Sequence, residues 1–119
     1  MKNVYFIILA LIFIGCASKE MMMVRQMEIQ NVDTGNIQNG EYIGTFTYSG
    51  FEYKVKTIIK AHRISNVEIL QNRDTKHAKM AEGVIPEIIK KQSPNVDAVS
   101  GATTTSKALM KAVEKSLEQ

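Results

Sequence analysis

The sequence predicts an α+β fold, a small antiparallel β-meander packed by two to three helices, from two patterns in its 119 residues. Residues 40–72 are rich in β-branched and aromatic residues that alternate with polar ones, and the following residues place apolar side chains at helical spacing. Because the strands come first and the helices follow, consecutive strands are expected to pair antiparallel. A composition of 45% hydrophobic and 23% charged residues is that of a globular domain.

The clearest strand pattern is YKVKTIIK at residues 53–60, whose odd-numbered positions hold Tyr, Val, Thr and Ile. These four side chains are expected to form one inward face. YIGTFTY precedes this strand across the turn SGFE, and RISNVEIL follows a tight connection near Ala61 and His62. Three strands joined by such short turns form a meander.

The segment TKHAKMAEGVIPEIIKKQ, residues 75–92, has near-helical spacing that Gly83 and Pro86 interrupt. Proline inside a helix removes a hydrogen bond but is well placed at the first helical position, so two short helices are expected. A last helix is expected over residues 104–117. Its inward face is expected to consist of Leu109, Val113 and Leu117, with Ala108 and Ala112 beside them.

The first segment, MKNVYFIILALIFIGCAS, has the architecture of an export signal, with one lysine before an apolar run from Val4 to Ile14. The run is shorter than the about 20 residues that cross a bilayer and fits the roughly 7 to 15 residues of a signal peptide. FIGC, ending at Cys16, resembles the bacterial lipobox, in which the cysteine is lipidated and becomes the mature N-terminus. Phe13 departs from that pattern, which usually has leucine.

The predicted organisation is a lipoprotein signal peptide at residues 1–15, a lipidated tether at 16–39 that is loosely ordered, and a folded domain at 40–119. The lipid on Cys16 would hold the domain at a membrane face outside the cytoplasm. Since Cys16 is the only cysteine, lipidation would leave the mature domain without a thiol for a disulfide, a nucleophile or a metal ligand. The alternative is that Cys16 is an ordinary buried thiol at the end of the signal.

Charge and histidine content exclude two classes of function. The formal net charge is only +3 and the lysines are spread along the chain, so no nucleic-acid binding is predicted. His62 and His77 lie apart and lack other ligand types at suitable spacing. A surface role is therefore expected for both histidines, and no metal site is predicted.

The stretch DAVSGATTTSKAL, residues 97–109, places two serines, three threonines and a glycine where the last helix starts. Free backbone N–H groups and the positive end of the helix dipole make this position a natural site for an anion such as phosphate. Gly101 and Ala102 would let a bulky group approach the backbone closely. The alternative is that the hydroxyls of Ser100 and residues 103–106 merely compete to cap the helix, which needs only one of them.

DAVSGATTTSKAL is similar to the signature of the bacterial FMN-binding domain family, in which an aspartate is followed by a Ser/Thr-Gly-Ala-Thr core. The resemblance runs from about Gly40 to Gln119. GEYIGTFTYSGFEYKVKTIIKAHRISNVEIL resembles the opening strands of the family, and IPEIIKKQSPNVDAVSGATTTSKALMKAVEKSL resembles its second half. AHRIS departs from the family, which usually has a glycine at that hairpin connection.

The resemblance implies that FMN is carried as a phosphoester on Thr103, the threonine of the core. A separate flavin transferase, which uses FAD and a magnesium ion, attaches it by phosphoryl transfer with AMP as the leaving group. Ser100 and Thr104 to Ser106 are expected to cap the helix and to bond the phosphate. Thr104 and Thr105 are the fallback acceptors. The matching recognition positions in this sequence are Asp97, Ser100, Gly101 and Ala102.

The resemblance further implies an electron-transfer flavoprotein rather than an enzyme with its own substrate, because the flavin supplies the redox chemistry. Its redox partner proteins are not indicated by any motif. Two alternatives stay open. One is a noncovalent FMN-binding module or small flavin reductase, and the other is a lipoprotein with a non-redox structural or binding role.

Overall fold

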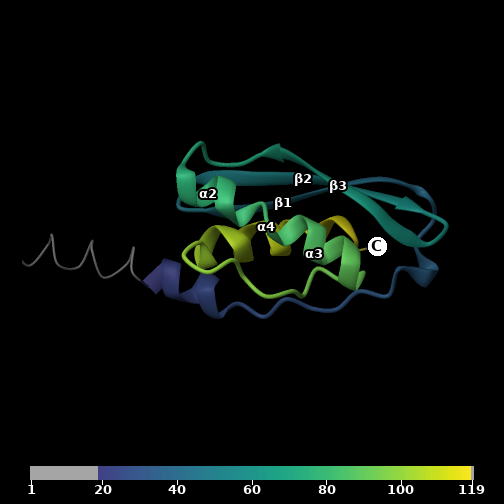
Figure 1. The fold of residues 1–119 in the computed structure, drawn as a ribbon, viewed down its shortest axis with the longest axis horizontal. Coiled ribbons are helices and arrows are strands. Elements are labelled where there is room, and N and C mark those ends of the chain that lie inside the picture. Colours follow the sequence, from purple (N-terminus) through teal and green to yellow (C-terminus); the bar gives the residue numbers. More distant parts are fainter. Residues whose placement is uncertain (1–18, 119) are drawn as a thin grey trace, which may run out of the picture.

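A three-stranded antiparallel sheet in the order β1-β2-β3 forms one layer of the computed structural model, which describes residues 19–118 (Figure 1). The strands are β1 (Gly40–Tyr48), β2 (Phe51–Lys60) and β3 (Arg63–Gln71). Strand β2 is central; it pairs with β1 over residues 51–59 and with β3 over residues 54–60. The predicted meander is confirmed.

The turn between β2 and β3 consists of Ala61 and His62, which both have positive φ, 53° and 60°. Two-residue turns of this hand match the twist of the flanking strands but usually contain glycine. Here hydrogen bonds hold His62, the second turn residue, in place. The Thr34 hydroxyl donates to the His62 carbonyl over 2.6 Å, and the His62 ring nitrogen Nδ1 lies 2.9 Å from the Ile37 carbonyl. These bonds support a turn that the sequence pattern located correctly without glycine.

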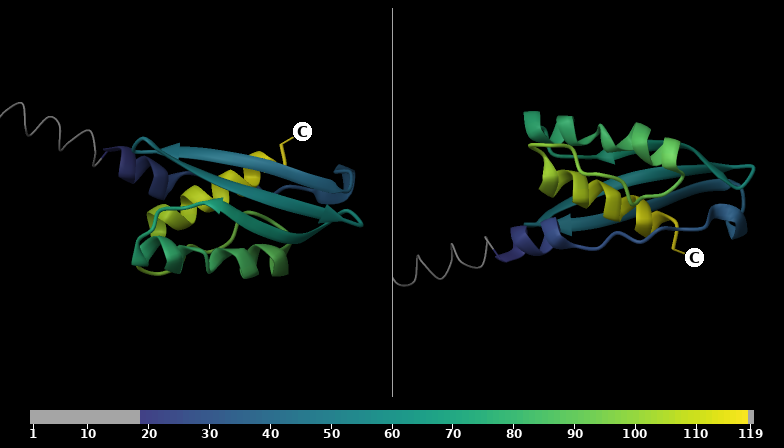
Figure 2. Two further views of the ribbon diagram at one scale, coloured as in Figure 1. Left: turned by 90° about the horizontal axis from the view of Figure 1, so that it is seen from above. Right: turned by 60° about the horizontal axis from the view of Figure 1, so that its bottom comes forward.

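Three helices lie on one face of the sheet, as Figures 1 and 2 show. They are α2 (Lys76–Ala81), α3 (Val84–Lys91) and α4 (Thr103–Ser116). Gly83 separates α2 from α3, and Pro86 lies in the first turn of α3, where a backbone N–H has no helical partner. The predicted pair of short helices and the long last helix are therefore confirmed.

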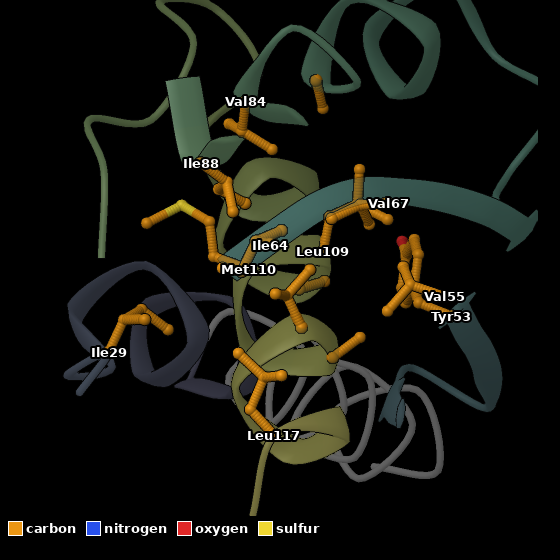
Figure 3. Close-up of a cluster of buried hydrophobic side chains, with 14 of the residues drawn as sticks. Ile29, Tyr53, Val55, Ile64, Val67, Val84, Ile88, Leu109, Met110 and Leu117 are labelled. Atoms are coloured by element: carbon orange, nitrogen blue, oxygen red, sulfur yellow. The ribbon is translucent and has the colours of Figure 1, made fainter. Parts of the chain in front are cut away.

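The core lies between β2, β3 and the inward faces of α3 and α4, and side chains from all four elements converge there in Figure 3. The odd-numbered residues of β2 that the alternation selected are all buried, from Tyr53 to Ile59. The predicted inward face of α4 is buried as well. It comprises Ala108, Leu109, Ala112, Val113 and the following Leu117.

Helix α4 approaches β1 very closely at Gly44. A Cβ atom at this position would lie 2.0 Å from the Ala112 carbonyl oxygen and 2.5 Å from the Ser116 nitrogen. The Ser116 hydroxyl also shares a buried hydrogen bond of 2.7 Å with the Thr57 hydroxyl on β2. Glycine in the strand and small residues on the helix thus fix where α4 lies, and with it the position of its N-terminus.

The segment that precedes β1 packs on the domain, which corrects the expectation of a loosely ordered tether for residues 19–39. Residues 19–26 are helical, and the chain then runs alongside α4 (Figure 1). Val24, Ile29 and Ile37 are at most 5% exposed. These isolated apolar residues follow no strand or helix period in a polar stretch, so the sequence pattern gave no sign of their burial.

One face of α4 holds this N-terminal segment through polar side chains. Glu114, 2% exposed, accepts the N–H of Gln30 over 2.7 Å and pairs with Lys111. The ammonium groups of Lys107 and Lys111 donate to the backbone carbonyls of residues 27–28 at 3.1 and 3.3 Å. The segment therefore has a defined position relative to the start of α4.

None of the helices within residues 19–118 is long and apolar enough to cross a membrane. The predicted signal peptide and Cys16 lie outside the described residues.

Candidate functional site: a hydroxyl-lined pocket at the start of helix α4

A pocket of about 280 Å³ lies where the chain turns into α4. Five consecutive residues of the hydroxyl-rich stretch line it, Gly101 to Thr105, and two residues distant in sequence complete the wall. These two are Arg25, from the N-terminal helical residues, and His77, from the first turn of α2. The three threonines at the start of α4 are half-buried.

None of the hydroxyls in this stretch caps α4, which corrects the expectation that Ser100 and Thr104 to Ser106 do so. The N-cap position is Ala102, which has no side-chain oxygen, and no side chain among the described residues replaces it. Ser106 is fully buried one turn into the helix, where its Oγ accepts the N–H of Val99 over 3.0 Å. Its hydroxyl therefore shapes the loop, and the first N–H groups of α4 are left without a side-chain cap.

Gly101 has φ 83°, a conformation that side chains rarely tolerate. A Cβ atom there would meet nothing within 4 Å, so backbone conformation rather than space requires glycine. This turn lets the Ala102 N–H bond back to the Val99 carbonyl over 2.9 Å while the chain enters the helix. The exposed glycine leaves the backbone beside the pocket uncovered.

Arg25 is the site residue that sequence reasoning missed. Its Nε donates to the Thr104 hydroxyl over 2.9 Å, across 79 positions of sequence. A single arginine in a polar segment carries no pattern that distinguishes it from a solvated side chain. Only the packing of the N-terminal segment on α4 brings it to the motif.

Only some of the site residues predicted from the sequence line the pocket. Thr103, Gly101, Ala102 and Thr104 all line the pocket, whereas Asp97 and Ser100 are exposed and do not contribute to its wall. His77 is exposed, as a surface role predicted, and also faces the pocket.

The electrostatic character of the pocket suits an anion. Among the described residues that line it, Arg25 is positively charged and none carries a carboxylate. The first turn of α4 has no acidic residue to offset the positive end of its dipole. Residues 19–118 hold no group of three or more histidine, cysteine, aspartate or glutamate side chains placed to bind a metal ion. The chemistry available is that of hydroxyls, backbone N–H groups and a guanidinium.

Comparison with known proteins gives a family match and one relative. Residues 48–118 match the model of the FMN-binding domain, a range that contains the pocket threonines and His77 but not Arg25. An uncharacterized protein of Treponema pallidum (strain Nichols) is 35% identical over 85 residues. That alignment covers 70% of this chain and 24% of the relative, so the chain spans about a quarter of the length of this curated relative.

Proposed function

The chain belongs to the FMN-binding domain family, and from this premise we propose that it is an electron carrier with FMN attached as a phosphoester to Thr103. Membership of the family makes it a flavin-binding protein with FMN as cofactor. Our proposal adds three properties to this: the covalent link, the electron-transfer role and the membrane anchor.

One observation carries the proposal: a half-buried threonine hydroxyl opens a helix whose N-terminal N–H groups have no side-chain cap, in a pocket that also contains Arg25. If the hydroxyls served only the helix, one of them would occupy the N-cap, and Ala102 stands there instead. The arrangement is understandable if a ligand satisfies those donors.

The residues present fit a phosphoester. The FMN phosphate joined to threonine is a diester with one negative charge, and helix N-termini bind phosphates through their N–H groups and dipole. Thr104 and Thr105 add hydroxyls to the pocket wall, and Arg25 adds a matching positive charge. Gly101 presents no side chain that would block the approach of the phosphate.

The attachment step requires a flavin transferase, FAD and a magnesium ion. Thr103 Oγ forms a bond to the FMN-side phosphorus of FAD, the bond from this phosphorus to the AMP oxygen breaks, and AMP leaves. The hydroxyl proton of Thr103 is released in the same exchange. Thr103 needs only an accessible hydroxyl on backbone that another enzyme can engage, because metal and positioning supply the rate.

Once bound, FMN supplies the chemistry of electron transfer, and the chain's own residues position it. The packing of residues 19–39 affects how close to the membrane electron transfer would take place. Three residue steps separate Cys16 from Lys19, which span at most about 11 Å. A lipid on Cys16 would therefore hold the folded domain close to the membrane face, where membrane-bound redox partners are within reach.

The proposal is tested by intact mass of the denatured full chain, made with and without the transferase. We expect a gain of about 438 Da, the mass of FMN less water, that disappears in Thr103→Ala. Thr47→Ala is the matched control, since Thr47 is an exposed threonine on β1 outside the pocket. An unchanged mass in the wild-type chain, while a known substrate of the same transferase is modified, would overturn the covalent link.

A noncovalent FMN module is the second candidate, because the same cationic pocket suits the phosphate of free FMN. The two candidates differ in one readout of this experiment. A noncovalent flavin leaves the chain on denaturation and adds no mass.

A further inference from the structure

We propose that Arg25 is a phosphate-binding residue of the flavin site, whose guanidinium contacts the phosphodiester on Thr103. The proposal rests on the attachment of FMN to Thr103 argued above. It assigns a function to the segment before residue 48, which lies outside the family match. In the structure the same guanidinium contacts Thr104, the next residue along the helix.

The hydrogen bonding of Arg25 leaves capacity for a ligand. Within residues 19–118 its one hydrogen bond is from Nε to the Thr104 hydroxyl at 2.9 Å. A guanidinium carries five N–H donors in a rigid fork that matches two phosphate oxygens. The remaining donors are available to an anion beside Thr103, which lines the same pocket.

Arg25 is an exposed cation beside the N-terminus of α4, a position where an anion would be favoured. The positive end of the α4 dipole favours acidic side chains, and a cation there is repelled. No acidic residue lies in the first turn of α4, and Arg25 makes no ion pair with the carboxylates of the described residues. A phosphodiester between the guanidinium and the helix N-terminus would turn this repulsion into attraction on both sides.

The backbone around Arg25 is fixed, so its position is a property of the fold. Val24 beside it is 5% exposed, and Lys107 donates to the Met27 carbonyl two residues further on. Before it, the Glu20 carboxylate accepts the N–H of Ser49 over 2.9 Å. A side chain on a fixed backbone loses less conformational entropy when it binds.

The test is a thermodynamic cycle on the full chain. The Arg25→Gln and wild-type chains are each made with and without the transferase, and intact mass establishes that both carry FMN. Melting temperature is then compared between the modified and unmodified forms. Gln26→Ala is the matched control, since Gln26 is an exposed neighbour on the same helical stretch and lies outside the pocket.

We expect flavin attachment to raise the melting temperature of both chains. The rise should be about 5 °C smaller in Arg25→Gln than in the wild type. Gln26→Ala should show the full rise, and Arg25→Lys a partial one, because an ammonium keeps the charge but not the fork. Equal rises in the wild type and Arg25→Gln, with FMN present on both, would overturn the inference and leave the proposed function standing. If Arg25 had only a structural role, Arg25→Gln would lower the melting temperatures of the modified and unmodified forms equally. The rise on flavin attachment would then equal that of the wild type, which contradicts the inference.

If the wild-type chain takes no adduct, the proposed function fails, and titration with free FMN and riboflavin still decides the role of Arg25. A phosphate-binding arginine predicts that Arg25→Gln weakens FMN binding by roughly tenfold and leaves riboflavin, which lacks the phosphate, unaffected. Equal effects on both flavins, or none on either, would contradict it.

Discussion

At the scale of single residues, the candidate site depends on Gly101, which takes φ 83° where the chain enters α4. We expect Gly101→Ala to destabilise the fold by about 1–2 kcal/mol, because the added Cβ meets no neighbour and only backbone strain is introduced. Chemical denaturation measures this loss. The substitution should also slow flavin attachment to Thr103, since the relaxed turn would move the hydroxyl.

The matched control for this prediction is Ala61→Gly, at a turn position that also has positive φ but lies in the β2–β3 hairpin. Replacing alanine there relieves the same strain, so we expect a gain of up to about 1 kcal/mol and unchanged flavin attachment. Destabilisation by Ala61→Gly larger than that of Gly101→Ala would contradict the assignment of strain.

The sequence motif identified some residues of the candidate site but not others. The motif identified Thr103, Gly101, Ala102 and Thr104 because neighbours in sequence stay neighbours at a helix start. Arg25 was not identified, because its contact with Thr104 depends on how two segments 79 positions apart pack. Capping was predicted wrongly for a related reason: several residues qualified as N-cap by type, and the turn at Gly101 placed Ala102 there instead.

At the scale of elements, the packing of α4 on β1 sets where the site lies. We expect Gly44→Ala to destabilise the domain by about 2–3 kcal/mol, since its Cβ would lie 2.0 Å from the Ala112 carbonyl oxygen and the helix must shift. Urea unfolding measures the loss. Ile43→Val, at the exposed neighbouring position, should change stability by less than about 0.5 kcal/mol. A Gly44→Ala chain as stable as Ile43→Val would show that α4 does not pack as described.

The elements themselves were predictable where periodicity is strong. The alternation in β2 and the apolar periodicity of α4 correctly predicted where each element lies and which residues face inward. This succeeded because each element buries one regular face in the common core. The packing of residues 19–39 was not predictable, since single apolar residues such as Ile29 and Ile37 follow no repeat and are buried by the shape that the other elements create.

At the scale of the whole molecule, the docked N-terminal segment joins the predicted lipid anchor to the flavin site. Residues 19–39 pack on the domain, and the described part of the chain begins three residue steps after Cys16. If Cys16 carries a lipid, as we propose, the domain would lie close to the membrane face, and Arg25 would connect the N-terminal segment to the motif through its bond to Thr104.

We therefore expect Cys16→Ser to release the full chain from the membrane fraction while leaving flavin attachment intact, because anchor and acceptor are separate residues. Fractionation and in-gel flavin fluorescence measure the two properties, and Ser18→Ala is the control. Retention of the Cys16→Ser chain in the membrane fraction would contradict the lipid anchor without affecting the flavin site.

The proposed attachment of FMN to Thr103 is tested by fragmentation mass spectrometry of the tryptic peptide spanning residues 92–107, from the chain made with the transferase. This peptide contains all three threonines and both flanking serines of the motif. We expect one FMN on this peptide, placed on Thr103 by fragments that separate it from Thr104. An FMN on Thr104, Thr105 or Ser100, or an unmodified peptide beside a modified control substrate, would contradict it.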